Sequence, residues 1–159
     1  MENDPTSDER YLLEQYKLYV EMADRVSERR GKTNQLYIGV LSGLIALLSF
    51  LSGCTYFKGY FIQIVPFVSI FGIILCLVWM LNIASYRQLN TAKFQIIHRM
   101  EEQLPFACYK NEWELLGNGT NFWKYLQLTK VEKYVPVVLA FPFILFLIVS
   151  IALMVKVTL

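Results

Sequence analysis

Charge is absent from three long stretches of this chain. Lys32 and Lys58 enclose 25 residues without a charged side chain, Lys58 and Arg87 enclose 28, and Lys133 and Lys156 enclose 22. A helix needs roughly 20 apolar residues to cross a hydrocarbon layer about 30 Å thick, and backbone polar groups cannot remain unpaired there. The stretches predict an all-α membrane protein with three transmembrane helices, the first two forming a hairpin.

The sequence also lacks the residue sets that most catalytic and metal sites require. His98 is the only histidine, and the three cysteines include no Cys-x-x-Cys pair. No glycine-rich phosphate loop occurs, and the three apolar stretches contain none of the ionisable residues on which proton relays and ion-coupled transporters depend. We therefore expect no enzyme, no cofactor and no metal site. Assembly, a pore or an anchor remain as functions.

The basic residues are distributed unevenly along the chain. Of the 15 Lys and Arg, all except Lys58 and Lys156 precede the first apolar stretch or lie between the second and the third. Basic residues favour the cytoplasmic side of a membrane. The N-terminus and the middle segment are therefore predicted to be cytoplasmic, and the C-terminus to be outside.

These patterns divide the chain into four segments. Residues 1–34 form a cytoplasmic amphipathic helix, 35–84 a transmembrane helical hairpin, 85–132 a cytoplasmic helical segment, and 133–157 the third transmembrane helix. Within the third of these segments, Pro105 predicts the end of one helix and Gly117 the end of a second, short one. No proline separates the cytoplasmic helices from the spans that adjoin them, so each pair is expected to be continuous.

An apolar stripe follows one face of the N-terminal helix. Glu21 and Arg25, on the opposite face, have the spacing of an i,i+4 ion pair. Spacings of three and four residues are typical of helix against helix packing. The stripe packs either on the chain's own cytoplasmic segment or on copies of itself, as an oligomer seam. It comprises Leu12, Tyr16, Tyr19, Ala23 and Val26.

Small residues follow one side of each of the first two spans. Such residues let helix backbones approach closely, and their hydroxyl groups could also line a narrow, mildly polar pore. Both interpretations stay open at this point. The residues concerned are Gly39, Ser42, Gly43, Ala46 and Ser49 in the first span, and Ser69 and Gly72 in the second.

Basic and aromatic side chains of the segment 85–132 are candidates for binding a nucleotide or an oligonucleotide as a signal, since phosphates attract cations and bases stack on aromatic rings. A solvated helix face with interfacial aromatics would contain the same residue types. Lys93 also falls on a second apolar stripe, with Leu89, Ile96 and Met100. The candidates are Arg87, Lys93, Arg99, Lys110, Trp113 and Lys124.

The run 12–30 before the hairpin and the motifs Ser-Tyr-Arg-Gln-Leu-Asn at 85–90 and Ala-Lys-Phe at 92–94 resemble the bacterial SLATT proteins. These are transmembrane effectors associated with SMODS nucleotidyltransferases and SLOG sensors. The resemblance covers roughly residues 12–113 and includes no catalytic motif. The chain is also similar to the channel component of Hailong-type anti-phage systems. The third span departs from the plain two-span pattern.

The resemblance implies an effector of anti-phage defence that permeabilises the bacterial inner membrane when a nucleotidyltransferase product triggers it. The leading hypothesis is therefore a homo-oligomeric channel, with membrane lipid and copies of itself as partners and a nucleotide as regulatory ligand. The alternative is a membrane anchor or adaptor that conducts nothing and holds a cytoplasmic partner through the face of Tyr16 and Tyr19.

Overall fold

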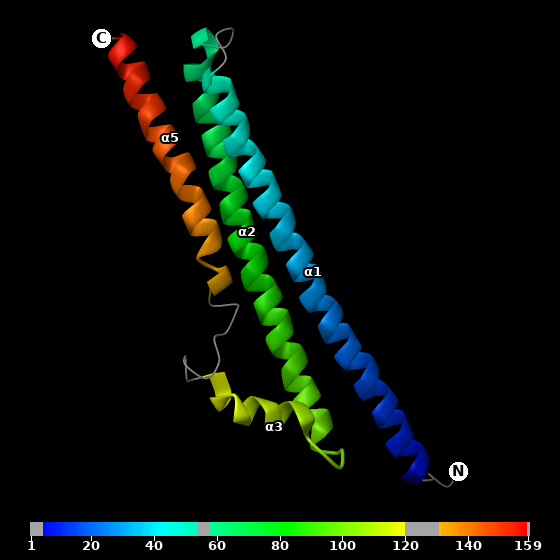
Figure 1. Cartoon of the computed structure of the whole chain (residues 1–159). Coiled ribbons are helices and arrows are strands. Elements are labelled where there is room, and N and C mark those ends of the chain that lie inside the picture. The colour runs from blue at the N-terminus through cyan, green and yellow to red at the C-terminus, as the bar shows by residue number, and fades with distance from the viewer. Residues whose placement is uncertain (1–4, 54–57, 120–130, 159) are drawn as a thin grey trace. The chain divides into compact units, whose positions relative to one another are not determined.

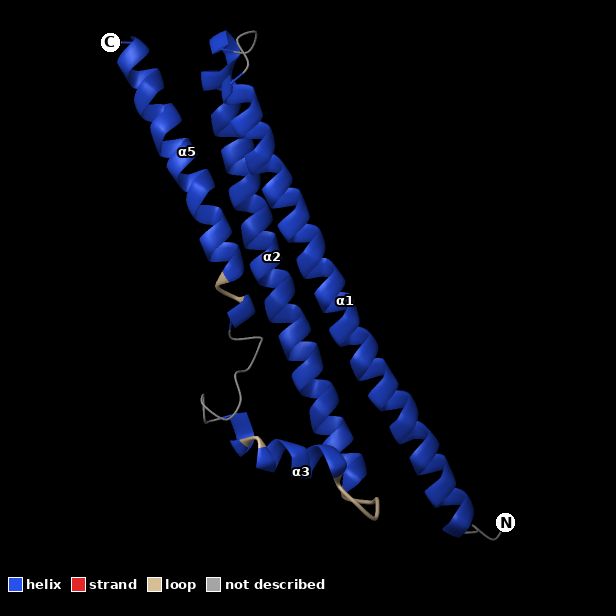
Figure 2. Cartoon of the chain, viewed as in Figure 1, coloured by secondary structure: helices blue, strands red, loops and turns tan. Residues whose placement is uncertain are grey.

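The computed structural model describes residues 5–53, 58–119 and 131–158, and within these ranges the regular structure is helical, without strands (Figures 1 and 2). Helix α1 spans Pro5–Gly53, α2 Lys58–Glu101, α3 Cys108–Leu115 and α5 Val135–Thr158, and a single 3₁₀ turn covers Gly117–Gly119. Helices α1, α2 and α5 are each long and apolar enough to cross a membrane. The predicted all-α class with three candidate spans is confirmed.

Helices α1 and α2 are much longer than a bilayer crossing requires. They contain 49 and 44 residues, so α1 alone extends about 74 Å at 1.5 Å per residue. Each helix therefore joins an apolar run to a polar run without interruption, which confirms the predicted continuity. Gly31 does not end α1, although glycine weakens a helix interior by roughly 1 kcal/mol relative to alanine.

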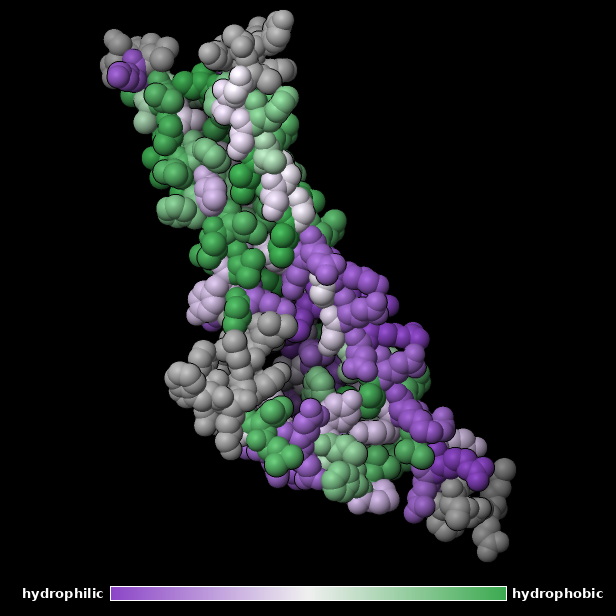
Figure 3. All heavy atoms as spheres, viewed as in Figure 1, coloured by the Kyte–Doolittle hydropathy of each residue, from purple (hydrophilic) through white to green (hydrophobic). Residues whose placement is uncertain are grey.

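The chain folds into two compact units, each of which pairs segments distant in sequence. We call Met1–Gly31 with Ala84–Lys130 the polar unit, and Lys32–Ile83 with Val131–Leu159 the apolar unit. Each unit contains one part of α1 and one part of α2, running antiparallel. Apolar side chains gather over α5 and the adjoining parts of α1 and α2, whereas hydrophilic side chains cover the N-terminal part of α1 (Figure 3).

The core of the apolar unit is thin. Its buried side chains come from α1, α2 and α5, and many neighbouring apolar side chains are exposed, among them Phe67, Leu81 and Val138. A helix that is apolar beyond its packed face is typical of a membrane environment. The buried members are Leu41, Leu48, Val65, Cys76, Trp79, Ile83 and Phe143.

In the polar unit, helices α2 and α3 end where the sequence predicts. Helix α2 ends at Glu101, before Leu104 and Pro105, because the residue before a proline disfavours the helical conformation. Helix α3 ends in front of Gly117, whose φ of 71° lies in the left-handed region that glycine adopts readily. Asn118, with φ of 52°, continues the turn.

Candidate functional site

The small residues of α1 form a stripe that the chain itself leaves open. Leu41 and Leu48 point into the core, and at about 100° per residue the stripe lies on the opposite side of the helix. A Cβ atom added at Gly39 or Gly43 would meet no atom within 4 Å. We call this exposed set the α1 stripe: Gly39, Ser42, Gly43, Ala46 and Ser49.

The α1 stripe is mildly polar. Ser49 Oγ donates to the carbonyl oxygen of Ile45 at 2.9 Å. The hydroxyl hydrogen of Ser49 is thus satisfied within the helix, and its oxygen keeps accepting capacity. Such a face tolerates contact either with another helix or with water.

The space beside the small residues of α2 is occupied by side chains of the same chain. A Cβ atom at Gly72 would lie 2.6 Å from Cδ1 and Cε1 of the Phe143 ring on α5. Ser69 is completely buried one turn away. The structure therefore separates two sets of residues that sequence spacing groups together. Ser69 and Gly72 lie inside the protomer, whereas the α1 stripe faces outward.

A polar clasp joins α1 to α2 inside the apolar unit. Trp79 Nε1 donates to Asn34 Oδ1 at 2.8 Å, and Asn82 Nδ2 donates to the Tyr37 hydroxyl oxygen at 2.8 Å. The rings of Tyr37 and Trp79 stack with centroids 5.5 Å apart. Two side chains from each helix thus fix the register of the hairpin. Sequence reasoning missed Asn34 and Tyr37 as functional residues, and their signal is the presence of polar groups close to an apolar run.

In the polar unit, Glu101 is buried at the end of α2, with 1% of its surface exposed. Its carboxylate accepts hydrogen bonds from the backbone N–H groups of Tyr109 at 2.7 Å and Lys110 at 3.0 Å. These groups belong to the first turn of α3, where backbone donors lack partners within the helix and negative charge is favourable. Glu101 therefore caps α3, whose N-cap residue Ala107 makes no side-chain cap bond.

The same carboxylate ties α1 to this site, because Tyr16 Oη donates to Glu101 Oε1 at 3.0 Å. Burial and the hydrogen bond to the Glu101 carboxylate both raise the pKa of the Tyr16 phenol above its ordinary value, so the phenol stays a donor at neutral pH. Burial is also the main cause of the raised pKa of Tyr109. The Tyr109 ring packs edge to face against Phe94.

The predicted seam on α1 has contacts within the chain. Besides the Tyr16 bond, the ring of Tyr19 lies under the Lys93 ammonium, with Nζ 4.7 Å from the ring centroid. Ala23 is buried, and Leu12 and Val26 are half-buried. These contacts correspond to the alternative in which the stripe packs on the chain's own helix. A role of the seam between chains stays a prediction.

The candidates for binding a signal do not form one cluster. Lys93 is only 7% exposed and lies under α1, whereas Arg87, Arg99 and Lys110 are exposed and Trp113 is half-buried. Arg87 and Arg99 lie about 18 Å apart along α2 at 1.5 Å per residue. Lys124 lies outside the described residues.

The Glu21 and Arg25 pair is confirmed, with 2.6 Å between Arg25 Nη2 and Glu21 Oε1 on the exposed face of α1. Such a pair contributes only a few tenths of a kcal/mol. Across the part of the chain that the structure describes, no three His, Cys, Asp or Glu side chains come close enough together to hold a metal ion.

Three long apolar helices, with an open stripe of small residues on the first, define a helical membrane protein with a face available to a further helix. The model of the octameric membrane protein family matches residues 13–152, and the chain belongs to this family. No curated protein and no solved structure matches the chain significantly. Family membership supports the predicted self-association and membrane location. The SLATT and Hailong resemblances are not part of this finding and stay predictions.

Proposed function

We propose that this protein is the subunit of a homo-oligomeric membrane channel, in which the α1 stripes of the assembled copies face a common axis. The observation that carries the proposal is the open space around Gly39 and Gly43 on the side of α1 away from α2. Membership of an octameric family supplies the further copies that would surround the axis.

The composition of the α1 stripe suits the interior of an assembly better than contact with lipid. Large apolar side chains that are exposed in the single chain on another face of α1, such as Leu36, Val40 and Leu47, suit lipid or a neighbouring helix. Small residues instead allow close approach of helix backbones. Hydroxyl oxygens at Ser42 and Ser49 would give the lumen hydrogen-bonding groups without fixed charge.

A route for gating follows from the unbroken helices. Helices α1 and α2 each run from the apolar unit into the polar unit, so a change in the polar unit can be transmitted as a helix movement. The polar unit contains 11 of the 15 Lys and Arg residues, and this distribution supports a cytoplasmic location. The resemblance to SLATT proteins supports an inner-membrane effector in anti-phage defence with a nucleotide-type trigger, for which Arg87, Arg99 and Lys110 offer exposed cations.

The alternative is a non-conducting anchor that holds a partner through Tyr16 and Tyr19. Both residues already contact α2 within the chain, so binding a partner there would require these contacts to break. This observation favours the channel over the anchor.

Ion flux from liposomes that contain the purified protein tests the proposal. Replacing Gly39 and Gly43 together by Leu should abolish flux, because eight bulky pairs would fill the axis or prevent assembly. Gly31→Leu is the matched control, since Gly31 also lies on α1 with open space around its Cβ position but outside the apolar run. Unchanged flux in the double variant, or equal loss in the control, would contradict the proposal.

A further inference from the structure

One flank of the polar unit carries exposed apolar side chains that the chain itself leaves uncovered. On α1, Tyr11, Leu18 and Met22 are exposed, Leu18 by 58%, and on α2 Leu89 and Ile96 are exposed. These residues alternate with charged ones outside the apolar runs. Clustered exposed apolar groups of this kind mark an interaction surface.

The two sets lie on the same flank of the helix pair. Successive residues of a helix are about 100° apart around its axis. Around the α1 axis, Leu18 and Met22 lie to one side of the residues that contact α2, and around the α2 axis Ile96 lies to one side of Lys93, with the same sense of rotation. Because the helices run antiparallel, the same sense of rotation leads to the same flank of the pair. Tyr16 and Glu101, which contact each other, lie on the other side of the contact line. We call the exposed set the apolar flank.

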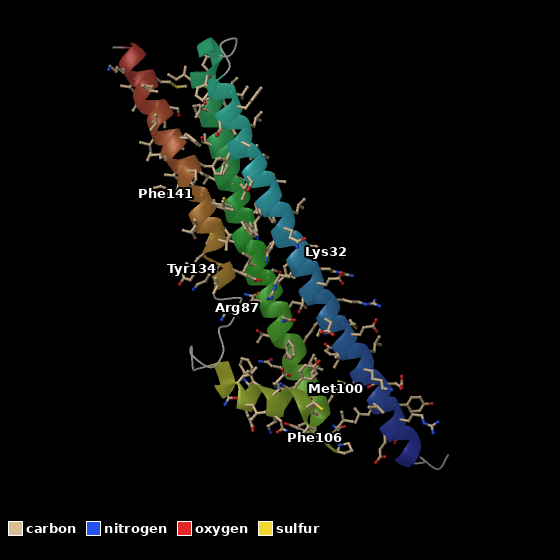
Figure 4. All side chains as sticks on the ribbon, in the orientation of Figure 1. Lys32, Arg87, Met100, Phe106, Tyr134 and Phe141 are labelled. Atoms are coloured by element: carbon tan, nitrogen blue, oxygen red, sulfur yellow. The ribbon has the colours of Figure 1, made fainter. Side chains whose placement is uncertain are left out.

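The opposite flank of the polar unit is formed by α3. Glu101 caps α3, and the contact between Phe94 and Tyr109 places α3 at the level of Ile96 along α2. Helix α3 and the residues before it present large exposed apolar side chains, with Leu115 exposed by 79% and Phe106 by 65%. Figure 4 shows Met100 and Phe106 near the junction of α2 and α3.

The two flanks differ in charge. Arg29 and Arg99 are exposed along the apolar flank, and Glu14 is exposed at its edge, next to Leu18 on α1. Helix α3 exposes Glu112, Glu114 and Lys110. The flanks thus match in level and in apolar character, and Arg99 and Glu112 provide a pair of opposite charges across one interface.

We propose that the apolar flank of one copy binds α3 of the next copy, with Leu115 against Met22 and Ile96, and Glu112 paired with Arg99. A closed ring requires every subunit to present two different, complementary surfaces, and these two flanks meet that requirement. Helix α3, held in place by Glu101 within its own chain, is then the element that joins neighbouring polar units. The inference rests on the self-association of the family and holds whether or not the assembly conducts ions.

Disulfide cross-linking in native membranes tests the contact. In a chain with Cys54, Cys76 and Cys108 replaced by Ala, Met22→Cys combined with Leu115→Cys should yield, on mild oxidation, a ladder of covalent oligomers that extends to the octamer. Each single-cysteine variant should remain monomeric on a denaturing gel. The matched control combines Lys17→Cys with Leu115→Cys, because Lys17 is exposed on the face of α1 away from the apolar flank. An absent ladder, or an equal ladder in the control, would overturn the inference.

A charge exchange provides a second test that does not depend on cysteine. Native mass spectrometry of the detergent-solubilised protein should show that Glu112→Arg lowers the octameric fraction at least several-fold. Adding Arg99→Glu to the same chain should restore it. Failure of the second substitution to restore the octamer, with helix content by circular dichroism unchanged, would contradict the pairing. If a variant that has lost the octamer retained its ion flux, the result would contradict the proposed channel and leave the contact unaffected.

Discussion

The capping of α3 by Glu101 leads to a prediction about local stability. Replacing Glu101 by Ala removes a carboxylate that accepts two backbone N–H bonds and the Tyr16 hydroxyl bond. Loss of a helix cap costs about 1 kcal/mol, and loss of a hydrogen bond to a charged group about 1.5–3 kcal/mol. The variant no longer has to bury a charge, which offsets part of this cost. We expect α3 to be destabilised by about 2–3 kcal/mol relative to its locally unfolded state.

Hydrogen exchange measured by mass spectrometry provides the assay. At tenfold per 1.4 kcal/mol, amide exchange in α3 should accelerate roughly 30- to 150-fold in the Glu101→Ala variant, while exchange in α5 stays unchanged. Glu102→Ala is the control, because Glu102 is the adjacent carboxylate and is exposed. If exchange in α3 were the same in both variants, or unchanged from the parent in the Glu101 variant, the capping argument would be refuted.

Three further substitutions test other contacts of the structure. Gly72→Leu should lower the thermal stability of the protein in detergent, because even a Cβ atom there lies 2.6 Å from the Phe143 ring; adding Phe143→Ala should recover part of the loss. Trp79→Phe keeps the ring stack but removes the bond to Asn34, and should cost about 0.6–1.7 kcal/mol in a steric-trap or denaturant titration. Lys93→Met keeps the buried stem and loses the cation–π contact, so the free energy of unfolding should change by less than about 1 kcal/mol in a denaturant titration. A larger loss would show that the ammonium has a further essential partner.

The helices and spans could be predicted from the sequence because their causes are local. The lengths of the uncharged stretches, Pro105 and Gly117 are each visible within a few residues. The sequence did not reveal which of the two sets of small residues would be packed within the chain and which would be exposed. Gly39 and Gly72 have similar sequence surroundings, but of these two only Gly72 has the space beside it occupied, by the Phe143 ring of a helix distant in sequence.

Burial of polar groups was also beyond the sequence. Glu101 lies among other polar residues near the end of α2, and its partner Tyr16 is 85 positions away, so no local pattern distinguishes it from the exposed Glu102. For Lys93 a signal did exist, since it falls on the apolar spacing of α2 with Met100, and the structure buries it. Spacing predicted its environment better than its charge did.

Water access to the α1 stripe tests the account most directly. In a chain without its native cysteines, Ser42→Cys and Ala46→Cys should react with a charged, membrane-impermeant methanethiosulfonate reagent, because thiols must ionise in water to react. Val40→Cys and Leu47→Cys, exposed in the single chain but on another face of α1, should remain unlabelled against lipid or a neighbouring helix. Labelling confined to Ser42→Cys and Ala46→Cys, together with a block of ion flux, is the predicted result. Equal labelling of all four positions, or labelling of Val40→Cys and Leu47→Cys alone, would contradict a channel lined by α1.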